Sequence, residues 1–116
     1  MINNIKLIIF DLDGVLINSK TNMKIAWNHV KKKFNIKKNF YEYFQFVGYP
    51  FFEILTKLSI TKNHQKIEQE FNKVSLKNLN KISTYKNVQK VLFYFKKKKI
   101  QMAIVTSKNK SRTIRL

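Results

Sequence analysis

Cysteine, acidic side chains and long apolar runs are absent or scarce in this 116-residue sequence. Without cysteine the chain can form neither a disulfide framework nor a thiolate metal site. No segment approaches the roughly 18 consecutive apolar residues of a membrane span. The first residues show no basic leader followed by an apolar core and a small-residue cleavage site. The sequence therefore predicts a cytoplasmic protein that does not enter a membrane.

Acidic residues are few: six carboxylates stand against 24 bases, which gives a formal net charge of +18. Such a balance usually suggests a nucleic acid or an anionic membrane as partner, because basic surface attracts phosphate by releasing counterions. Here Lys, Asn, Ile and Phe make up 59 of the 116 residues, and all four have AT-rich codons. Only two bases are Arg, the residue suited to bidentate phosphate recognition. We therefore attribute the positive charge to Lys side chains on the solvated surface, whose number reflects the codon bias of an AT-rich genome. We expect neither a nucleic acid nor a membrane as partner.

Apolar residues are abundant enough for one core, since 44% of the chain is hydrophobic and its length is that of one ordinary domain. The segment KLIIFD is apolar and rich in Ile, which predicts a strand buried on both faces. From Ser19, a potential N-cap, the period changes to that of a helix. The apolar face of that helix comprises Met23, Ala26, Trp27, Val30 and Phe34.

Helical patterns continue to residue 82. A short helical segment, FYEYFQFV, is expected to stop at Gly48, and another starts with Pro50 in its first turn. Asn63 can cap a longer helix. The residues expected to face inward from it are Ile67, Phe71, Val74 and Leu79.

Strand character returns near the end of the sequence. A helix with Val88, Val91, Leu92 and Phe95 on its apolar face precedes a second strand, IQMAIVTS, and NKSRTIRL is typical of a helix start. Strand, helix and strand in this order predict a parallel α/β unit with a right-handed crossover. The helical block is too long for one crossover. We therefore expect a helical subdomain over residues 19–82, inserted into a partial α/β core formed by residues 1–18 and 83–116.

Two of the six acids, Asp11 and Asp13, follow the first strand. At the carboxyl end of a parallel strand, where open α/β sheets place their ligands, both carboxylates would project to the same side. Like charges so close require a cation or a proton, which suggests a divalent metal or separate acid and base roles. Asp13-Gly14 also suits a type I′ hairpin turn, and a merely capped strand end is a third interpretation. An EF-hand is excluded, because Leu16 and Asn22 occupy the positions of its Gly and closing Glu.

A second polar group follows the second strand. Thr106 and Ser107 end this strand, and Lys108 and Lys110 lie in the helix start that comes next. Hydroxyls and free backbone N–H groups at such a junction can hold a phosphate. Because parallel neighbours end at the same edge of a sheet, we expect this group to lie beside Asp11 and its neighbours.

These residues carry a family resemblance that runs over the whole chain. IIFDLDGVLINS resembles the first motif of the haloacid dehalogenase superfamily of phosphotransferases, and MAIVTSK resembles the second. VGYPFFEIL is similar to the Gly-Pro segment in the helical caps of phosphoglycolate-phosphatase-like members. The resemblance implies an α/β fold: a Rossmann-like core, here with a partial parallel sheet, and an inserted all-helical cap.

Carried onto this sequence, the resemblance implies a Mg²⁺-dependent phosphatase of small phosphate monoesters such as phosphoglycolate or a sugar phosphate. Asp11 would be the nucleophile that forms an aspartyl-phosphate. Asp13 would protonate the leaving oxygen and then activate water. Thr106 would hydrogen-bond the phosphoryl group, helped by backbone N–H groups near Leu12 and Ser107. Asp11 and the Asp13 carbonyl would ligate Mg²⁺, whose charge offsets the repulsion between carboxylate and phosphate.

Two features depart from the family pattern. Asn18 stands where many relatives carry Asp, which we expect to affect a loop or cap contact more than the chemical step. The third motif, a Lys, and the fourth, acids of the metal site, belong downstream of this sequence, and Lys108 and Lys110 are too close to the second strand for the third-motif role. We therefore expect these 116 residues to be a truncated fragment with weak or no activity, whose unpaired sheet edges promote self-association.

The alternative function from another class is a small basic nucleic-acid-binding protein. In its favour, KKKFNIKK and FYFKKKK interleave aromatic residues with Lys. Most of these aromatics fall on apolar helix faces, which favours a place in the core. A catalytically inactive relic of the phosphatase fold is a third interpretation.

Overall fold

The computed structural model describes residues 4–108 and has a parallel pair of strands at one end. Strand β1 (Leu7–Phe10) lies beside β4 (Gln101–Ile104), with Phe10 opposite Ile104. Helix α5 (Val88–Lys97) leads into β4 and packs on one face of the pair, where the rings of Phe10 and Phe95 are 6.4 Å apart. The predicted parallel α/β unit is confirmed, and the fold is mixed α/β.

The hairpin alternative is not observed, because β1 pairs with a strand about ninety residues away. The segment after β1 instead folds back on itself. The backbone N–H groups of Leu16 and Ile17 both donate to the carbonyl oxygen of Leu12, at 3.0 and 3.1 Å. Gly14 permits this turn with a φ of 82°, a left-handed conformation that costs glycine little.

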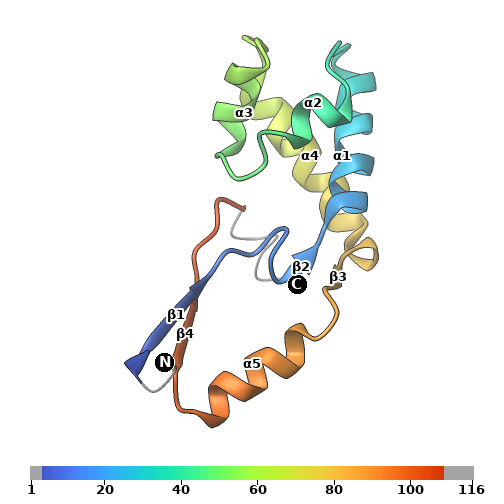
Figure 1. The fold of residues 1–116 in the computed structure, drawn as a ribbon. Helices are drawn as coiled ribbons and strands as arrows, with labels where there is room; N and C mark the ends of the chain where they lie inside the picture. Colours follow the sequence, from blue (N-terminus) through green and yellow to red (C-terminus); the bar gives the residue numbers. More distant parts are fainter. Residues whose placement is uncertain (1–3, 109–116) are drawn as a thin grey trace.

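The four helices α1 to α4 gather at the other end of the molecule (Figure 1). They are α1 (Lys20–Lys33), α2 (Phe40–Phe44), α3 (Phe51–Lys57) and α4 (His64–Lys77). Helices α1 and α4 pack side by side and enclose the fully buried Trp27 and Phe71. Trp27 stacks on Tyr43 of α2 with 4.5 Å between ring centroids. The predicted apolar face of the first helix is thus confirmed as part of this core.

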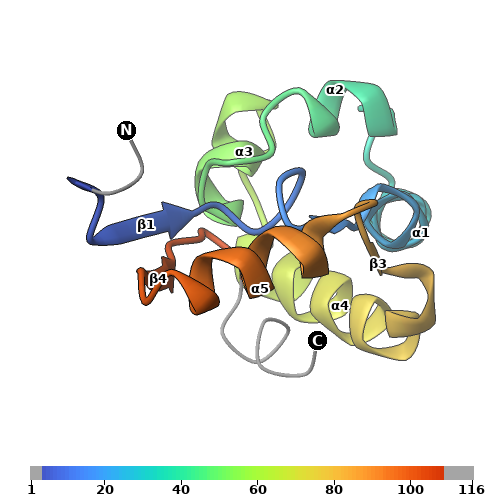
Figure 2. The same cartoon turned by 60° about the horizontal axis from the view of Figure 1, so that its bottom comes forward.

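Two chain segments connect the helices to the α/β end. The first contains β2 (Ile17–Asn18), and the second contains the 3₁₀ helix η2 (Leu79–Lys81) and β3 (Ser83–Thr84). Strands β2 and β3 pair in antiparallel orientation, so the outgoing and returning segments run together (Figure 1). Figure 2 shows how the returning segment with β3 follows α4 and leads to α5. This pair was not predicted, because two residues are too few for an alternating pattern.

Several local expectations need correction. The first strand was expected to be buried on both faces, but Ile9 is 58% exposed. Ile8 and Phe10 point the opposite way and are half-buried on the α5 side, while no element within residues 4–108 covers Ile9. Val91 is also exposed, and Leu79 lies in η2 rather than in α4.

Helix ends also differ from the expectations. Helix α2 ends at Phe44, before Gly48, and Pro50 occupies the N-cap of α3 rather than its first turn. Ser19 and Asn63 stand at the predicted N-caps, but neither side chain makes a capping hydrogen bond. The expected helix start NKSRTIRL, with Lys110, lies outside the described residues. No helix within residues 4–108 has both the length and the apolar character needed to cross a membrane.

Candidate active site

The two motifs identified in the sequence meet at one edge of the sheet. Asp11 directly follows β1, and Thr106 follows β4 after one intervening residue, Val105. The N–H of Val105 donates to the carbonyl oxygen of Phe10 at 2.9 Å, which extends the parallel ladder to the ends of both strands. The sheet therefore presents the polar residues after β1 and β4 at a common edge.

Asp13 is the more enclosed of the two acids, with a side chain that is 13% exposed. Ser19 donates a hydrogen bond to its Oδ1 at 2.5 Å, and the Lys108 ammonium contacts the same oxygen at 3.1 Å. The side chain of Lys108 is only 1% exposed. Two donors thus hold Asp13 Oδ1, and Oδ2 has no hydrogen bond from another described residue.

Asp11 is exposed, and its Oδ1 accepts a hydrogen bond from the backbone N–H of Leu12 at 2.7 Å. The Leu12 side chain is buried in a small cluster with Leu16 and Ile17. The Oγ1 of Thr106 accepts a hydrogen bond from the backbone N–H of Lys108 at 3.1 Å. This bond leaves the hydroxyl proton of Thr106 available to a ligand.

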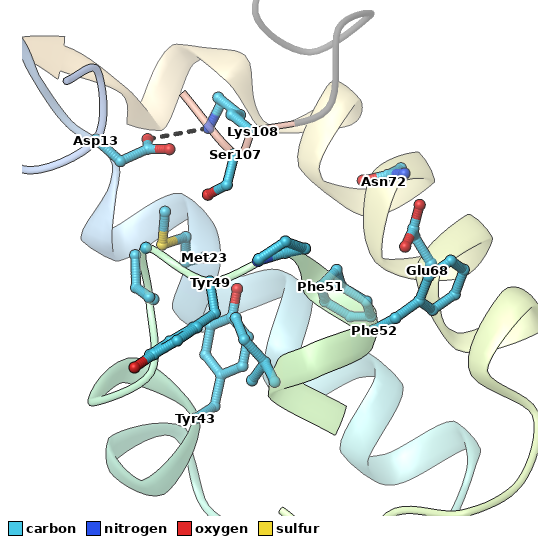
Figure 3. Close-up of a pocket in the computed structure, with 14 residues that line it drawn as sticks. Asp13, Met23, Tyr43, Tyr49, Phe51, Phe52, Glu68, Asn72, Ser107 and Lys108 are labelled. Carbon is cyan, nitrogen blue, oxygen red and sulfur yellow. Dashed lines mark hydrogen bonds and ion pairs between the residues drawn. The ribbon is translucent and has the colours of Figure 1, made fainter. Parts of the chain in front are cut away.

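A cavity of about 230 Å³ opens between this edge and the helices (Figure 3). Asp13, Ser107 and Lys108 line it from the α/β side, whereas Asp11, Leu12 and Thr106 are outside its lining. The helical side contributes Met23 of α1, aromatic residues around α2 and α3, and two polar residues of α4, Glu68 and Asn72. Such a cavity suits a small organic molecule.

The donor set suits a hard cation such as Mg²⁺, which prefers oxygen ligands and keeps several waters. Asp11 supplies an exposed carboxylate, and the carbonyl oxygen of Asp13 accepts no hydrogen bond from any residue in 4–108. No group of three or more metal-ligating side chains occurs in the described part of the chain. The two acids would therefore hold such an ion with water or substrate completing its coordination.

Two contacts of the site were missed by sequence reasoning. The sequence indicates Ser19 only as a helix cap, and it places Lys108 in the polar group beside Asp11 without predicting a contact with Asp13. The Lys108–Asp13 contact joins residues 95 positions apart, and no local pattern indicates it. A hydroxyl six residues after an acid likewise has no periodic signature.

Comparison with known proteins gives one family match: the family model described as haloacid dehalogenase-like hydrolase matches residues 8–116. Pyrophosphatase PpaX of Oceanobacillus iheyensis is 34% identical over 64 residues, which cover 55% of this chain and 30% of that protein. The chain therefore spans less than a third of this curated relative.

Solved structures share the fold. A hydrolase from Pseudomonas syringae superposes with a TM-score of 0.87 at 21% identity, covering 96% of this chain and 53% of that one. A predicted phosphoglycolate phosphatase from Haemophilus somnus 129PT superposes with a TM-score of 0.75 at 24% identity, covering 92% and 53%. The chain thus matches about half the length of each of these structures.

Proposed function

Because the chain belongs to the haloacid dehalogenase-like hydrolase family, we propose that it carries the nucleophile end of a Mg²⁺-dependent phosphatase acting on small phosphate monoesters. The observation that carries this proposal is the meeting of Asp13, Ser107 and Lys108 at one end of a cavity, beside the ends of two parallel strands. An acid, a hydroxyl and a buried cation together suit the binding and cleavage of a phosphate ester.

In the proposed reaction, a carboxylate oxygen of Asp11 bonds to phosphorus while the P–O bond of the ester breaks. In the same step Asp13 Oδ2 transfers a proton to the leaving oxygen. Water then attacks phosphorus, Asp13 takes up its proton, and the bond between Asp11 and phosphorus breaks to release inorganic phosphate. The contacts of Ser19 and Lys108 with Oδ1 support the positioning of this carboxyl group, because they fix its orientation and leave Oδ2 available.

The remaining groups would bind the phosphoryl oxygens. Thr106 would donate its hydroxyl proton, and backbone N–H groups near Leu12 and Ser107 would complete the set. Asp11 and the Asp13 carbonyl would hold Mg²⁺, which when bound supplies positive charge against the carboxylate and phosphoryl oxygens. The Leu12 N–H donates to Asp11 in this structure and would have to turn to the substrate.

We further propose that residues 19–82 act as the cap over an α/β core formed by residues 1–18 and 83–116. Two separate hydrophobic clusters support this division. One lies wholly within residues 23–74, and the other joins Leu12, Leu16 and Ile17 to Phe10 of β1, to Ile82, and to Val88 and Leu92 of α5. The cavity between the two parts would then hold the organic portion of the substrate.

The proposal is tested by the binding of Mg²⁺ with beryllium trifluoride, a mimic of an aspartyl-phosphate. Binding should raise the midpoint of thermal unfolding, since a ligand at 100 times its Kd adds about 2.7 kcal/mol to the free energy of unfolding. Asp11→Asn should abolish the shift, and Glu53→Gln, which changes an exposed acid outside the cavity, should preserve it. An equal shift in Asp11→Asn would refute the nucleophile assignment, and no shift in the unmodified chain would refute the binding of a phosphoryl mimic by these residues.

Turnover by the 116 residues is expected to be weak or absent, because Asp11 and Asp13 provide only part of a metal site. Hydrolysis of a chromogenic phosphate ester with Mg²⁺ measures this. Robust turnover that disappears in Asp11→Asn would refute the expected inactivity and support the nucleophile.

A nucleic-acid-binding role is the second candidate, favoured by one exposed surface of α5. Phe93 and Tyr94 are 60% and 45% exposed, with Lys97 over the first ring and Lys98 over the second. Such rings can stack on bases. Oligonucleotide binding that weakens steeply with salt and does not respond to Mg²⁺ or phosphate analogues would favour this role.

A further inference from the structure

Glu68, one of only six acids in the chain, has no partner among the described residues. No other residue within 4–108 forms a hydrogen bond or an ion pair with its carboxylate, although the chain carries 24 bases. The other acids are placed differently: Asp11 accepts from Leu12, Asp13 from Ser19 and Lys108, Glu42 from Asn39, Glu70 from His29 and Lys33, and Glu53 is exposed in the first turn of α3. The carboxylate of Glu68 is therefore not engaged by another side chain within residues 4–108.

The position of Glu68 relates it to the cavity. Glu68 and Asn72 are four residues apart on α4, so they lie on the same face of the helix, and both are half-buried. Both line the cavity, with Phe51 and Phe52 on the neighbouring wall (Figure 3). Lys108 lines the other end of the same cavity beside Asp13.

The cavity thus has two chemically different ends. At one end Lys108 is paired with Asp13 beside the strand ends, whereas the α4 end presents the carboxylate of Glu68 and the amide of Asn72 next to Phe51 and Phe52. A partly desolvated carboxylate repels a second carboxylate and accepts hydrogen bonds from hydroxyl groups. Ring faces pack well against the C–H surface of a carbon chain or sugar.

We propose that the substrate is a polyol or sugar phosphate rather than a phosphorylated carboxylic acid, and that Glu68 and Asn72 bind its hydroxyl groups. This inference rests on the proposed phosphatase function and separates two substrate classes that the sequence left open. Glu68 acts as a specificity-determining residue, because its charge excludes a carboxylate at the position where hydroxyls are bound.

The test compares the binding of glycerol 3-phosphate and 2-phosphoglycolate to the 116-residue chain with Mg²⁺, by isothermal titration calorimetry. Glycerol 3-phosphate is expected to bind at least tenfold more tightly. Glu68→Gln should reduce the ratio of the two dissociation constants at least fivefold. The change should come chiefly from tighter binding of phosphoglycolate, since the repulsive charge of Glu68 is removed. Glu53→Gln should leave the ratio unchanged, and circular dichroism should show that both variants fold.

Two results distinguish a failure of this inference from a failure of the proposed function. If inorganic phosphate binds, but phosphoglycolate binds as tightly as glycerol 3-phosphate or Glu68→Gln does not alter the ratio, the substrate class is refuted and the phosphatase site stands. If neither the esters nor inorganic phosphate bind, the proposed function fails and this inference falls with it.

Discussion

Replacement of Asn22 by alanine should destabilise the helical part of the protein strongly. Asn22 is fully buried in the first turns of α1. Its side-chain amide donates to the carbonyl oxygens of Ser75 and Asn78 at 3.0 and 2.9 Å, and its oxygen accepts from the Ser75 hydroxyl at 2.7 Å. These three bonds fasten the start of α1 to the end of α4.

The magnitude follows from these contacts. Each lost hydrogen bond costs about 1 kcal/mol, and more where a buried partner is left unpaired. The carbonyls of Ser75 and Asn78 also accept from the N–H groups of Asn78 and Lys81, so they are not left without any partner. Alanine recovers about 0.6 kcal/mol through its higher helix propensity. The net loss in the free energy of unfolding should therefore be about 2–3 kcal/mol.

Urea unfolding followed by Trp27 fluorescence measures this loss, because Trp27 is the sole tryptophan and lies in the helical core. Asn28 is the matched control: it lies exposed on the same helix, so Asn28→Ala should stabilise by about 0.6 kcal/mol. A double-mutant cycle of Asn22→Ala with Ser75→Ala should show coupling of about 0.5–3 kcal/mol. The reasoning is refuted if the free energy of unfolding of Asn22→Ala lies within about 0.5 kcal/mol of that of the unmodified chain, or if Asn28→Ala lowers this free energy by as much as Asn22→Ala does.

Three other perturbations have defined outcomes. Hydrogen bonds from His29 and Lys33 lower the pKa of Glu70, so its stabilising effect is present above the unfolded pKa of about 4.3 and is lost as the pH falls. Unfolding midpoints of Glu70→Gln and the unmodified chain should accordingly differ at pH 7 and converge near pH 3; a constant difference would contradict this. Gly14→Ala should cost about 1–2 kcal/mol in urea unfolding through its positive φ alone, because no atom lies within 4 Å of the added carbon; an unchanged midpoint would show that the turn adopts another conformation. Ile9→Lys should reduce concentration-dependent association in sedimentation, because this exposed side chain lies on the uncovered sheet face; a wild-type chain that is monomeric at all concentrations would contradict the expected self-association.

Much of the fold was predictable because its signals are local. The apolar positions from Met23 to Phe34 indicate a helix face regardless of which element packs against it, and the Ile-rich segment KLIIFD indicates a strand. The meeting of the two motifs followed from one topological rule, that parallel neighbours end at the same edge. The family resemblance is confirmed by the match over residues 8–116.

Other features could not be predicted, because they depend on long-range contacts. The pattern of β1 shows what the strand can bury but not which elements cover it, so the exposure of Ile9 was unexpected. Lys108 contacts Asp13 through a loop whose path no periodicity describes. The roles of Asp11 and Asp13, the metal and the division at residues 18 and 83 stay predictions until the experiments above are made.

The short β2–β3 pair has a consequence for the order of folding. Helices α1–α4 are continuous in sequence and can close their core before the sheet exists. Once Asn18 and Ser83 are paired, the loop that must close to join β1 to β4 shrinks from about ninety to about thirty residues, which lowers its entropic cost by about 1 kcal/mol. Early packing of the helices should therefore speed the formation of the sheet. Mutations in the helical core should then delay the assembly of the candidate active site, although most of the mutated residues do not line it.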